Sequence, residues 1–285
     1  MDPDDESLSA LLVLGQRLLL SASIEDARRE SRRLLAHALG VSLDGLPSRH
    51  RIGADARLRF EGLLRRRAAH EPFAYITGSQ GFWTLDLDVS AHTLIPRGDS
   101  ETVIESLLRL RPDRSRAWRV LDLGTGTGCL LLAALHEYRQ ATGLGVDLSP
   151  AACRVAARNA RRTGLAERAM LVCGRWHDAL AGPRFDIILS NPPYIPTGEI
   201  PLLMPEVARH EPHLALDGGP DGLEAYRSIL RDLGRRLAPG GIVLLEIGQG
   251  QAAAVTALGS AAGFRLLEVR QDLGGVARAL ALAQA

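Results

Sequence analysis

The fold of this chain is decided by the stretch Leu121-Asp122-Leu123-Gly124-Thr125-Gly126-Thr127-Gly128. Apolar residues give way there to a run of glycines, which is typical of a strand that turns into a helix. Glycines let a ligand approach the backbone closely, and a helix N-terminus directs amide hydrogens toward it. The Gly-x-Gly-x-Gly spacing departs from the Gly-x-Gly-x-x-Gly of dinucleotide-binding loops. A tight strand-to-helix turn without a ligand is the competing interpretation.

A carboxylate ends the next predicted strand, in Gly145-Val146-Asp147. In a nucleotide-binding α/β fold this position faces the ribose diol, which makes charge-assisted hydrogen bonds to a carboxylate. Asp122 stands beside the glycine loop, where it is placed to complement the ammonium of a methionine moiety, directly or through water. The combination predicts a site for a nucleoside without a diphosphate, such as S-adenosylmethionine. A plain helix cap at Asp147-Leu148-Ser149-Pro150 is the alternative.

A second motif, Ser190-Asn191-Pro192-Pro193-Tyr194, follows the apolar run at 185–189. Two consecutive prolines cannot continue a sheet ladder, so we expect the chain to leave the sheet at Asn191. Ligands of open α/β sheets bind at the carboxyl ends of the strands, which puts Asn191 and Tyr194 on a stiff loop over that crevice. A simple strand-ending turn is the alternative, because Asn-Pro opens many turns.

From Trp118 onward the sequence pattern alternates between strands and helices. This alternation predicts an α/β fold with a doubly wound sheet and helices on both of its faces. A helix from Asp99 to about Leu110 precedes the first strand, so the larger domain is expected to cover residues 99–285. The predicted strands are 120–123, 144–146, 170–173, 185–189, 242–247, 264–269 and 277–282.

The residues before this domain fall into two segments. Leucines and alanines recur at helical spacing from Ser7 to Arg67, which predicts a small helical bundle over residues 1–70. Alternating apolar and polar residues from Phe82 to Val89 predict a β-hairpin within a connector at 71–98. The run Arg65-Arg66-Arg67 is expected to be a solvated helix end, with a phosphate-binding or partner surface as the alternative.

Composition favours a soluble cytoplasmic protein. The 285 residues are 46% hydrophobic and 24% charged, with a formal net charge of +1 and no lysine. This balance gives no overall electrostatic case for nucleic acid. No apolar run is long enough to span a bilayer, and the eight scattered histidines suggest no metal cluster, with His210 and His213 expected in a loop. Reduced core thiols are expected at the widely spaced Cys129, Cys153 and Cys173.

The glycine loop, Asp147 and Asn-Pro-Pro-Tyr resemble the corresponding motifs of class I S-adenosylmethionine-dependent methyltransferases. More narrowly, most of the chain resembles the bacterial release-factor glutamine methyltransferases of the PrmC/HemK type. The Ile-Pro-Arg segment and the helical domain distinguish it from DNA adenine-N6 methyltransferases, which share Asn-Pro-Pro-Tyr. The narrower resemblance lies in 71–78, Phe82-Trp83, Leu94-Ile95-Pro96-Arg97, Glu101, Glu211-Pro212, Leu216-Asp217-Gly218-Gly219 and Asp221-Gly222-Leu223.

The resemblance implies S-adenosylmethionine as methyl donor and the glutamine of the Gly-Gly-Gln motif in class I peptide chain release factors as acceptor. No metal and no direct nucleic-acid contact are expected, and we expect a monomer whose helical domain recognises the release factor. The implied donor-binding residues are Gly124, Thr125, Gly126, Thr127, Gly128, Asp147, Trp176 and Asn191. The implied acceptor-binding residues are Asn191, Pro192, Pro193 and Tyr194, of which Asn191, Pro192 and Tyr194 are catalytic.

Two segments depart from the family pattern. Gly98 replaces the second proline of the usual Pro-Arg-Pro-Asp-Thr-Glu, which predicts a looser turn, and the segment 272–278 lacks the acidic residue usual before its arginine. Three other functions stay open: transfer to a ribosomal-protein glutamine, transfer to an adenine base, and nucleoside binding without catalysis. The adenine alternative predicts a basic groove bearing aromatic residues, for which the balanced charge and 4% aromatic content give no support.

Overall fold

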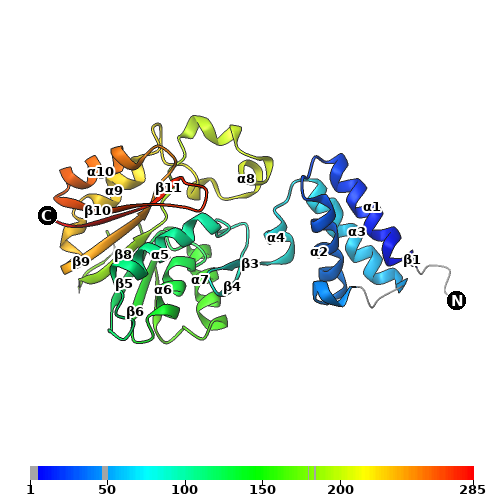
Figure 1. Ribbon diagram of the computed structural model, residues 1–285, viewed down its shortest axis with the longest axis horizontal. Helices are drawn as coiled ribbons and strands as arrows, with labels where there is room; N and C mark the ends of the chain where they lie inside the picture. Colours follow the sequence, from blue (N-terminus) through cyan, green and yellow to red (C-terminus); the bar gives the residue numbers. More distant parts are fainter. Residues whose placement is uncertain (1–5, 47–50, 179, 183) are drawn as a thin grey trace. The chain divides into compact units, whose positions relative to one another are not determined.

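The computed structural model describes residues 6–46, 51–178, 180–182 and 184–285. The chain divides into two compact units (Figure 1). The helical unit consists of Met1–Gly78 and Met204–His210, and the sheet unit consists of Ser79–Leu203 and Glu211–Ala285. The division falls after Gly78 rather than after residue 70, because the short helix α4 (Phe73–Thr77) contributes Phe73 and Ile76 to the core of the helical unit.

The helical unit is built on three longer helices, α1 (Leu8–Ser21), α2 (Ala27–Leu39) and α3 (Ala54–Ala68). Their apolar faces meet in one core, in which Leu11, Leu34 and Phe60 are completely buried. Gly40 ends α2 in the left-handed conformation, with φ 65°, as expected of a C-terminal glycine. The remaining elements are β1 (Glu6–Ser7) paired with β2 (Arg51–Ile52), the 3-10 turn η1 (Leu43–Gly45) and α8 (Pro205–His210).

The arginines that end α3 are paired rather than free. Arg67 is buried, with Nε 2.5 Å from Oε2 of Glu30 and Nη2 3.0 Å from Oε1 of Glu206. Arg65 and Arg66 each form an ion pair with a nearby glutamate. A buried guanidinium requires such partners, so the predicted solvated helix end is wrong for Arg67. The carboxylates also disfavour a phosphate site at this run.

Seven strands form the sheet of the sheet unit, in the order β10-β11-β9-β8-β5-β6-β7 (Figure 1). The strands from β5 to β9 are parallel, and β11 and β10 add antiparallel pairs at one edge. All seven predicted strands are confirmed, with ends that differ by a few residues. They are β5 (Arg119–Leu123), β6 (Thr142–Asp147), β7 (Ala169–Cys173), β8 (Phe185–Ser190), β9 (Leu237–Glu246), β10 (Phe264–Gln271) and β11 (Ala277–Gln284).

Helices cover both faces of this sheet (Figure 1). Successive residues of a strand point to opposite faces, so Leu189 belongs to one apolar cluster and Ile188 to the other. The doubly wound α/β fold predicted from the sequence is thereby confirmed. One cluster contains residues of α5 (Glu101–Leu110), α6 (Cys129–Glu137) and α7 (Pro150–Arg162), and the other contains residues of α9 (Glu224–Leu230) and α10 (Ala252–Ala261).

The strand order reverses at β5, which lies between β6 and β8. The chain runs from β5 outward to β6 and β7, and then returns to the other side of β5 to form β8 and β9. At such a switch point the loops after the two central strands diverge to opposite faces and leave a crevice. The glycine loop follows β5 and Asn-Pro-Pro-Tyr follows β8, so both motifs border this crevice.

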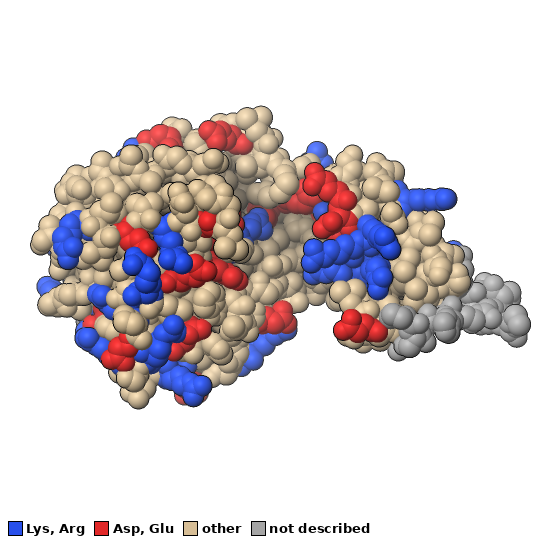
Figure 2. All heavy atoms as spheres, viewed as in Figure 1, with Lys and Arg blue, Asp and Glu red and all other residues tan. Residues whose placement is uncertain are grey.

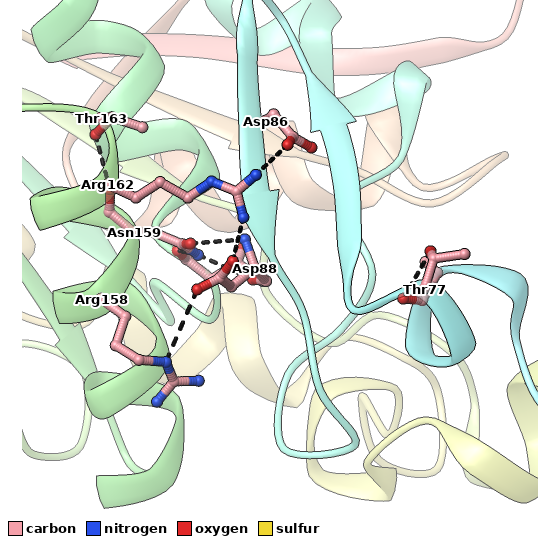
Figure 3. Close-up of polar contacts among 9 residues, drawn as sticks. Thr77, Asp86, Asp88, Arg158, Asn159, Arg162 and Thr163 are labelled. Carbon is pink, nitrogen blue, oxygen red and sulfur yellow. Dashed lines mark hydrogen bonds and ion pairs between the residues drawn. The ribbon is translucent and has the colours of Figure 1, made fainter. Parts of the chain in front are cut away.

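The predicted hairpin is present as β3 (Ser79–Phe82) paired antiparallel with β4 (Leu85–Asp88). Figure 3 shows side chains of α7 reaching β4. Asn159 accepts from the Asp88 amide at 2.7 Å and donates to the Asp88 carbonyl at 3.0 Å, while Arg162 pairs with Asp86 and Asp88. Asn159 also donates to the carbonyl of Thr127 at 2.9 Å. The hairpin is thus fastened to the glycine loop through a single buried side chain.

The three cysteines differ in how far they are buried. Cys129 and Cys153 are half-buried and free, whereas Cys173 is exposed. The prediction of a core thiol is therefore wrong for Cys173, because β7 is an edge strand and this residue ends it.

Within the described part of the chain, no helix combines the length and the apolar character that crossing a membrane requires.

Candidate active site

A cavity of about 650 Å³ lies in the sheet unit at the switch point. This volume is within the usual range for a site that takes a small molecule or cofactor. The predicted site residues that line it are Gly124, Thr125, Gly126, Thr127, Asp147, Trp176, Asn191 and Pro193. Other lining residues come from segments to which the site prediction did not point, among them Ala91, His92, Thr93, Leu214, Glu224 and Ser228.

The glycine loop has a conformation that requires glycine. Gly124, Gly126 and Gly128 have φ values of 73°, 54° and 84°, which side chains with a Cβ rarely adopt. A Cβ built on Gly126 meets nothing within 4 Å, so the space above this residue is open. Gly128 instead faces the protein and opens α6, and a Cβ there would lie 3.2 Å from Leu132. Gly126 is therefore the residue at which a ligand can approach the backbone most closely.

Asp122 lies beneath this loop and is buried. Its Oδ2 accepts from the Thr125 hydroxyl at 2.6 Å, and its Oδ1 has no hydrogen-bond partner among the described residues. Burial raises the pKa of Asp122 to about 7. The side chain therefore supports the loop from below, and the predicted contact with an ammonium group would have to use the unpaired Oδ1.

Asp147 ends β6 and lines the cavity. Its Oδ2 accepts from the Gly126 amide and its Oδ1 from the Ser149 amide, both at 2.8 Å. Desolvation raises the pKa of Asp147, and the two amides counteract that shift. Each oxygen keeps acceptor capacity for a ligand. The alternative role as a helix cap belongs to Ser149, whose hydroxyl accepts from the Ala152 amide at 3.2 Å.

Trp176 is held in an unusual backbone conformation beside the glycine loop. Its φ is 47°, in the left-handed region that bulky residues avoid, and such strain persists where the surrounding structure imposes it. The indole lines the cavity, and a Cβ on Gly124 would meet it at 3.3 Å. The ring is thus placed as a flat apolar wall for a planar ligand group.

The Asn-Pro-Pro-Tyr stretch begins directly after β8. Asn191 and Pro193 line the cavity, while Pro192 is buried. The Asn191 side chain donates from Nδ2 to the Ser100 hydroxyl oxygen at 3.2 Å, which leaves its Oδ1 as an acceptor. The Tyr194 hydroxyl donates to Oε1 of Glu246 at 3.3 Å, and burial raises the pKa of Tyr194. Part of Tyr194 remains accessible.

The backbone of this stretch is braced by the segment that follows Leu216. The Gly218 amide donates to the Ile195 carbonyl at 2.9 Å. Gly222 approaches so closely that a Cβ there would lie 2.4 Å from the Tyr194 carbonyl oxygen. The Gln251 side chain donates to that same oxygen at 2.9 Å. The carbonyl of Tyr194 is therefore fixed from two sides, which explains why glycine is needed at 222.

Glu211 holds the Ile-Pro-Arg segment in place. Its buried carboxylate accepts from the Ile95 amide at 3.1 Å through Oε2 and pairs with Arg97 through Oε1. Leu94 and Pro96, on either side of Ile95, line the cavity. Glu211, from a distant part of the sequence, thus fixes the segment that supplies Leu94 and Pro96 to the cavity wall.

Neither departure from the family pattern opens the structure. Gly98 begins a regular 3-10 turn, η2 (Gly98–Ser100), which is closed by a 3.1 Å hydrogen bond from the Ser100 amide to the Arg97 carbonyl. The turn is thus hydrogen-bonded, and its being looser than the proline-containing turn of the family stays a prediction. At the other segment, Arg278 pairs with Asp272 at 2.9 Å and with Asp99 at 3.3 Å. Asp272 thus supplies an acidic partner from within the same segment.

Histidines form no recognisable metal centre in the part of the chain that the structure describes. His213 lies in the turn η4 (His213–Ala215), 3.7 Å from Asp217, whereas His210 ends α8 and so is helical rather than in the predicted loop. Across residues 6–46, 51–178, 180–182 and 184–285, no group of three or more His, Cys, Asp or Glu residues is arranged to hold a metal ion.

Three residues near the site were missed by reasoning from the sequence: Ser100, Glu246 and Gln251. Glu246 had a usable signal, because an acidic residue follows the apolar run Ile242–Leu245 in a strand predicted to be buried. The sequence around Ser100 indicates only the start of a helix. Gln251 is recognisable only once the fold brings it to Tyr194.

The chain is similar to known proteins along most of its length. Residues 10–78 match the family model described as PrmC N-terminal domain, and residues 120–211 match a methyltransferase domain. A release factor glutamine methyltransferase of Rhodospirillum rubrum is 44% identical over 283 residues, covering 96% of this chain and 86% of the relative. Another, of Bradyrhizobium diazoefficiens, is 45% identical over 282 residues, covering 95% and 93%.

Among solved structures, a methyltransferase from Pyrococcus furiosus shares the fold. Its TM-score is 0.52 at 20% sequence identity, and the alignment covers 70% of this chain and 89% of that protein. At this identity the likeness supports the fold alone. The sheet unit therefore has the fold of a methyltransferase.

Proposed function

Since the chain belongs to the family of release factor glutamine methyltransferases, we propose that it methylates the glutamine of the Gly-Gly-Gln motif in class I peptide chain release factors. The methyl group would pass from S-adenosylmethionine to the side-chain amide nitrogen, N5, and so support translation termination in the cytoplasm. The observation that carries this proposal is that Asp147 and Asn191, predicted for the donor and for the acceptor respectively, border one cavity. We further propose that the enzyme acts as a monomer and without a metal.

The residues present fit S-adenosylmethionine, which supplies an electrophilic methyl group on its sulfonium when bound. The open space over Gly126 admits a ligand close to the backbone. The Asp147 carboxylate is placed to accept hydrogen bonds from ribose hydroxyls. Trp176 offers its indole face to the adenine. Asp122 is buried beneath the loop and is not among the residues that line the cavity, so its carboxylate would act on the methionine ammonium through water rather than by direct contact. Gly128 serves the loop indirectly, by opening α6.

An amide nitrogen is a poor nucleophile because its lone pair is delocalised into the carbonyl. We propose that Asn191 Oδ1 and the Pro192 carbonyl each accept one amide hydrogen, which orients the nitrogen lone pair toward the methyl group. Orientation and preorganised acceptors then supply the catalysis. Transfer would form the N–C bond as the C–S bond of the donor breaks, and the amide proton would leave to solvent. The accessible part of Tyr194 and Pro193 would pack against the acceptor amide.

Two other acceptors would use the same geometry. A ribosomal-protein glutamine presents the same amide, so only a substrate assay separates it from a release factor. An adenine base would require a nucleic-acid groove. On the face of the sheet unit shown in Figure 2, arginines and carboxylates are interspersed, which gives no support for such a groove there. A non-catalytic nucleoside-binding module would not need the acceptor geometry at Asn191.

The function is tested by offering all acceptors to the purified chain. It is incubated with methyl-labelled S-adenosylmethionine and a class I release factor, a ribosomal-protein substrate or DNA. We expect label on the release-factor glutamine, and none when that glutamine is replaced by alanine. Label on DNA, label only on the ribosomal protein, or no transfer at all would each contradict the proposal.

The variant Asp147→Ala is expected to weaken S-adenosylmethionine binding by about 1.5–3 kcal/mol, the value of lost hydrogen bonds to a charged group. Isothermal titration calorimetry measures this difference. Asp147→Asn is the matched variant, because it keeps the size of the side chain and one acceptor oxygen but loses the charge and the acceptor for one of the two amides, so a loss no larger than that of Asp147→Ala is expected. An unchanged affinity of Asp147→Ala would remove Asp147 from the donor site.

We propose that the helical unit recognises the release factor. Deletion of residues 1–78 should then abolish transfer to an intact release factor but leave donor binding and transfer to a short Gly-Gly-Gln peptide largely unchanged. The deletion should carry Glu206→Gln, because Glu206 otherwise loses its partner Arg67. Solubility and thermal unfolding are checked first, since apolar surface is exposed by the cut. Full activity on the intact release factor would refute the recognition role.

A further inference from the structure

Glu246 is a buried carboxylate that the proposed mechanism does not yet use. It ends β9, beside the strand that leads into Asn191, and only 1% of its surface is exposed. Its Oε1 accepts from the Tyr194 hydroxyl, and its Oε2 has no hydrogen-bond partner among the described residues. Burying a carboxylate with an unpaired oxygen is costly, so its presence next to the acceptor site calls for a functional reason.

Ser100 connects this carboxylate with the acceptor site. It is buried in η2 and borders the cavity. Its oxygen accepts from Nδ2 of Asn191 at 3.2 Å. Strand β11 brings η2 to Glu246, because Arg278 pairs with Asp99 and the next residue, Ala279, is the strand partner of Glu246. The Ser100 side chain accordingly lowers the pKa of Glu246. The unpaired Oε2 of Glu246 leaves room for a full hydrogen bond from this hydroxyl. Glu246 is thus one side chain removed from Asn191.

The direction of hydrogen bonding along this chain follows from the donor inventory. An ionised carboxylate can only accept, and a serine hydroxyl has a single hydrogen to donate. If Ser100 donates to Glu246, its oxygen is left to accept from Asn191. Asn191 then has to present Nδ2 to Ser100 and Oδ1 to the acceptor. A protonated Glu246 donates instead, which allows Ser100 to turn and the Asn191 amide to flip.

We propose that Glu246 is a positioning residue of methyl transfer, whose carboxylate acts through the Ser100 hydroxyl to turn the Asn191 oxygen toward the acceptor amide. In the flipped state Nδ2 of Asn191 would face the donor hydrogens of the glutamine, and the orienting hydrogen bond would be lost. The inference rests on the proposed function. It adds the contacts that keep Asn191 in the productive orientation.

Because Glu246 is titratable, the orientation of Asn191 should depend on pH. Burial raises the pKa of Glu246 to about 7, against the lowering effects of Ser100, Arg278 and Tyr194, while Asp99 raises it further. The ionised fraction therefore grows as pH rises through about 7, and the productive orientation is lost as pH falls below it. The other titratable groups that interact electrostatically with Glu246 are Tyr226 and Cys129, whose raised pKa values keep them neutral at that pH.

The orientation of Asn191 can be observed without any substrate. The sequence contains two asparagines, Asn159 and Asn191, so selective 15N-asparagine labelling gives two side-chain amide signals. Asn191→Ala assigns them, and Asn159, fixed by Asp88 and Thr127, is the internal reference. We expect the Asn191 signal to shift with a midpoint near pH 7. The shift should be absent in Glu246→Gln and in Ser100→Ala.

Transfer kinetics give the second readout. Single-turnover rates of the wild type should fall on the acid side of about pH 7. Ser100→Ala should lower the rate about tenfold at pH 8 and lose this pH dependence, because one orienting contact is removed. Ser100→Thr keeps the hydroxyl and should keep the acid-side loss of rate that Ser100→Ala abolishes. Thermal unfolding confirms that both variants are folded.

The outcomes separate this inference from the proposed function. If the wild type does not methylate a release factor, the function fails, whereas the NMR titration still tests the coupling of Glu246 to Asn191. If it does methylate, a wild-type rate in Ser100→Ala overturns the inference. An acid-side loss that persists in Ser100→Ala, or an Asn191 signal that titrates in Glu246→Gln, overturns it equally.

Discussion

Replacing Asn191 with alanine is expected to lower the rate of methyl transfer by about two to three orders of magnitude, the effect of losing one preorganised polar contact in a transition state. The reason is geometric, because in the proposed mechanism Oδ1 of Asn191 accepts an amide hydrogen of the glutamine and so orients its nitrogen. The Nδ2 contact with Ser100 restrains the Asn191 side chain. Single-turnover transfer to a release factor measures the rate, and calorimetry should find donor affinity little changed.

Asn191→Asp is the matched variant for this prediction. It keeps the size and the acceptor oxygen, but it cannot donate to Ser100 and adds a negative charge near Glu246. The charge favours the sulfonium donor while the acceptor pose is disturbed, so we expect donor binding to be retained with poor turnover. A wild-type single-turnover rate in Asn191→Ala would show the proposed mechanism to be wrong.

Gly126→Val is expected to abolish measurable S-adenosylmethionine binding. A valine would have to adopt φ 54°, and its side chain would project into the open space above the loop. If the backbone moves to relieve this strain, the amide of residue 126 also loses its hydrogen bond to Asp147. The loss should exceed that of Asp147→Ala, since the ligand is displaced as well as deprived of a contact. Calorimetry at high protein concentration measures it.

Gly164→Val separates backbone strain from loss of the site. Gly164 also has a left-handed φ, 73°, and a Cβ there meets nothing within 4 Å, but it follows α7 and does not belong to the cavity lining of the described residues. We expect it to lower thermal stability and to bind the donor normally. If both valine variants lose the donor to the same degree, general destabilisation rather than the open space over Gly126 explains the effect.

Local sequence patterns were sufficient for the strands and the two motifs of the site. The strand at 185–189 was predictable because an apolar β-branched run stops at two prolines, and both properties lie within a few residues. The glycine loop was predictable for the same reason. Donor and acceptor motifs could be placed at one edge of the sheet because carboxyl ends of parallel strands share that edge.

Tertiary partners could not be predicted in this way. Ser100 and Asn191 are far apart in sequence, and their hydrogen bond depends on how η2 meets the end of β8. Likewise, a charged run at the end of a helix is usually solvated, and nothing near Arg67 reveals that Glu30 and Glu206 enclose it. A short stretch of sequence indicates the helix or strand to which a residue belongs, whereas these contacts join residues of different elements.

The assignment of Met204–His210 to the helical unit constrains how this protein can change by recombination. The polypeptide passes from one unit to the other after Gly78, after Leu203 and again after His210, so the helical unit is encoded by two separated stretches. A gene fusion that exchanged the first stretch alone would leave Glu206 behind without the guanidinium it neutralises. Exchange of the helical unit therefore requires both stretches to be replaced together, and chimaeras between relatives should be designed accordingly.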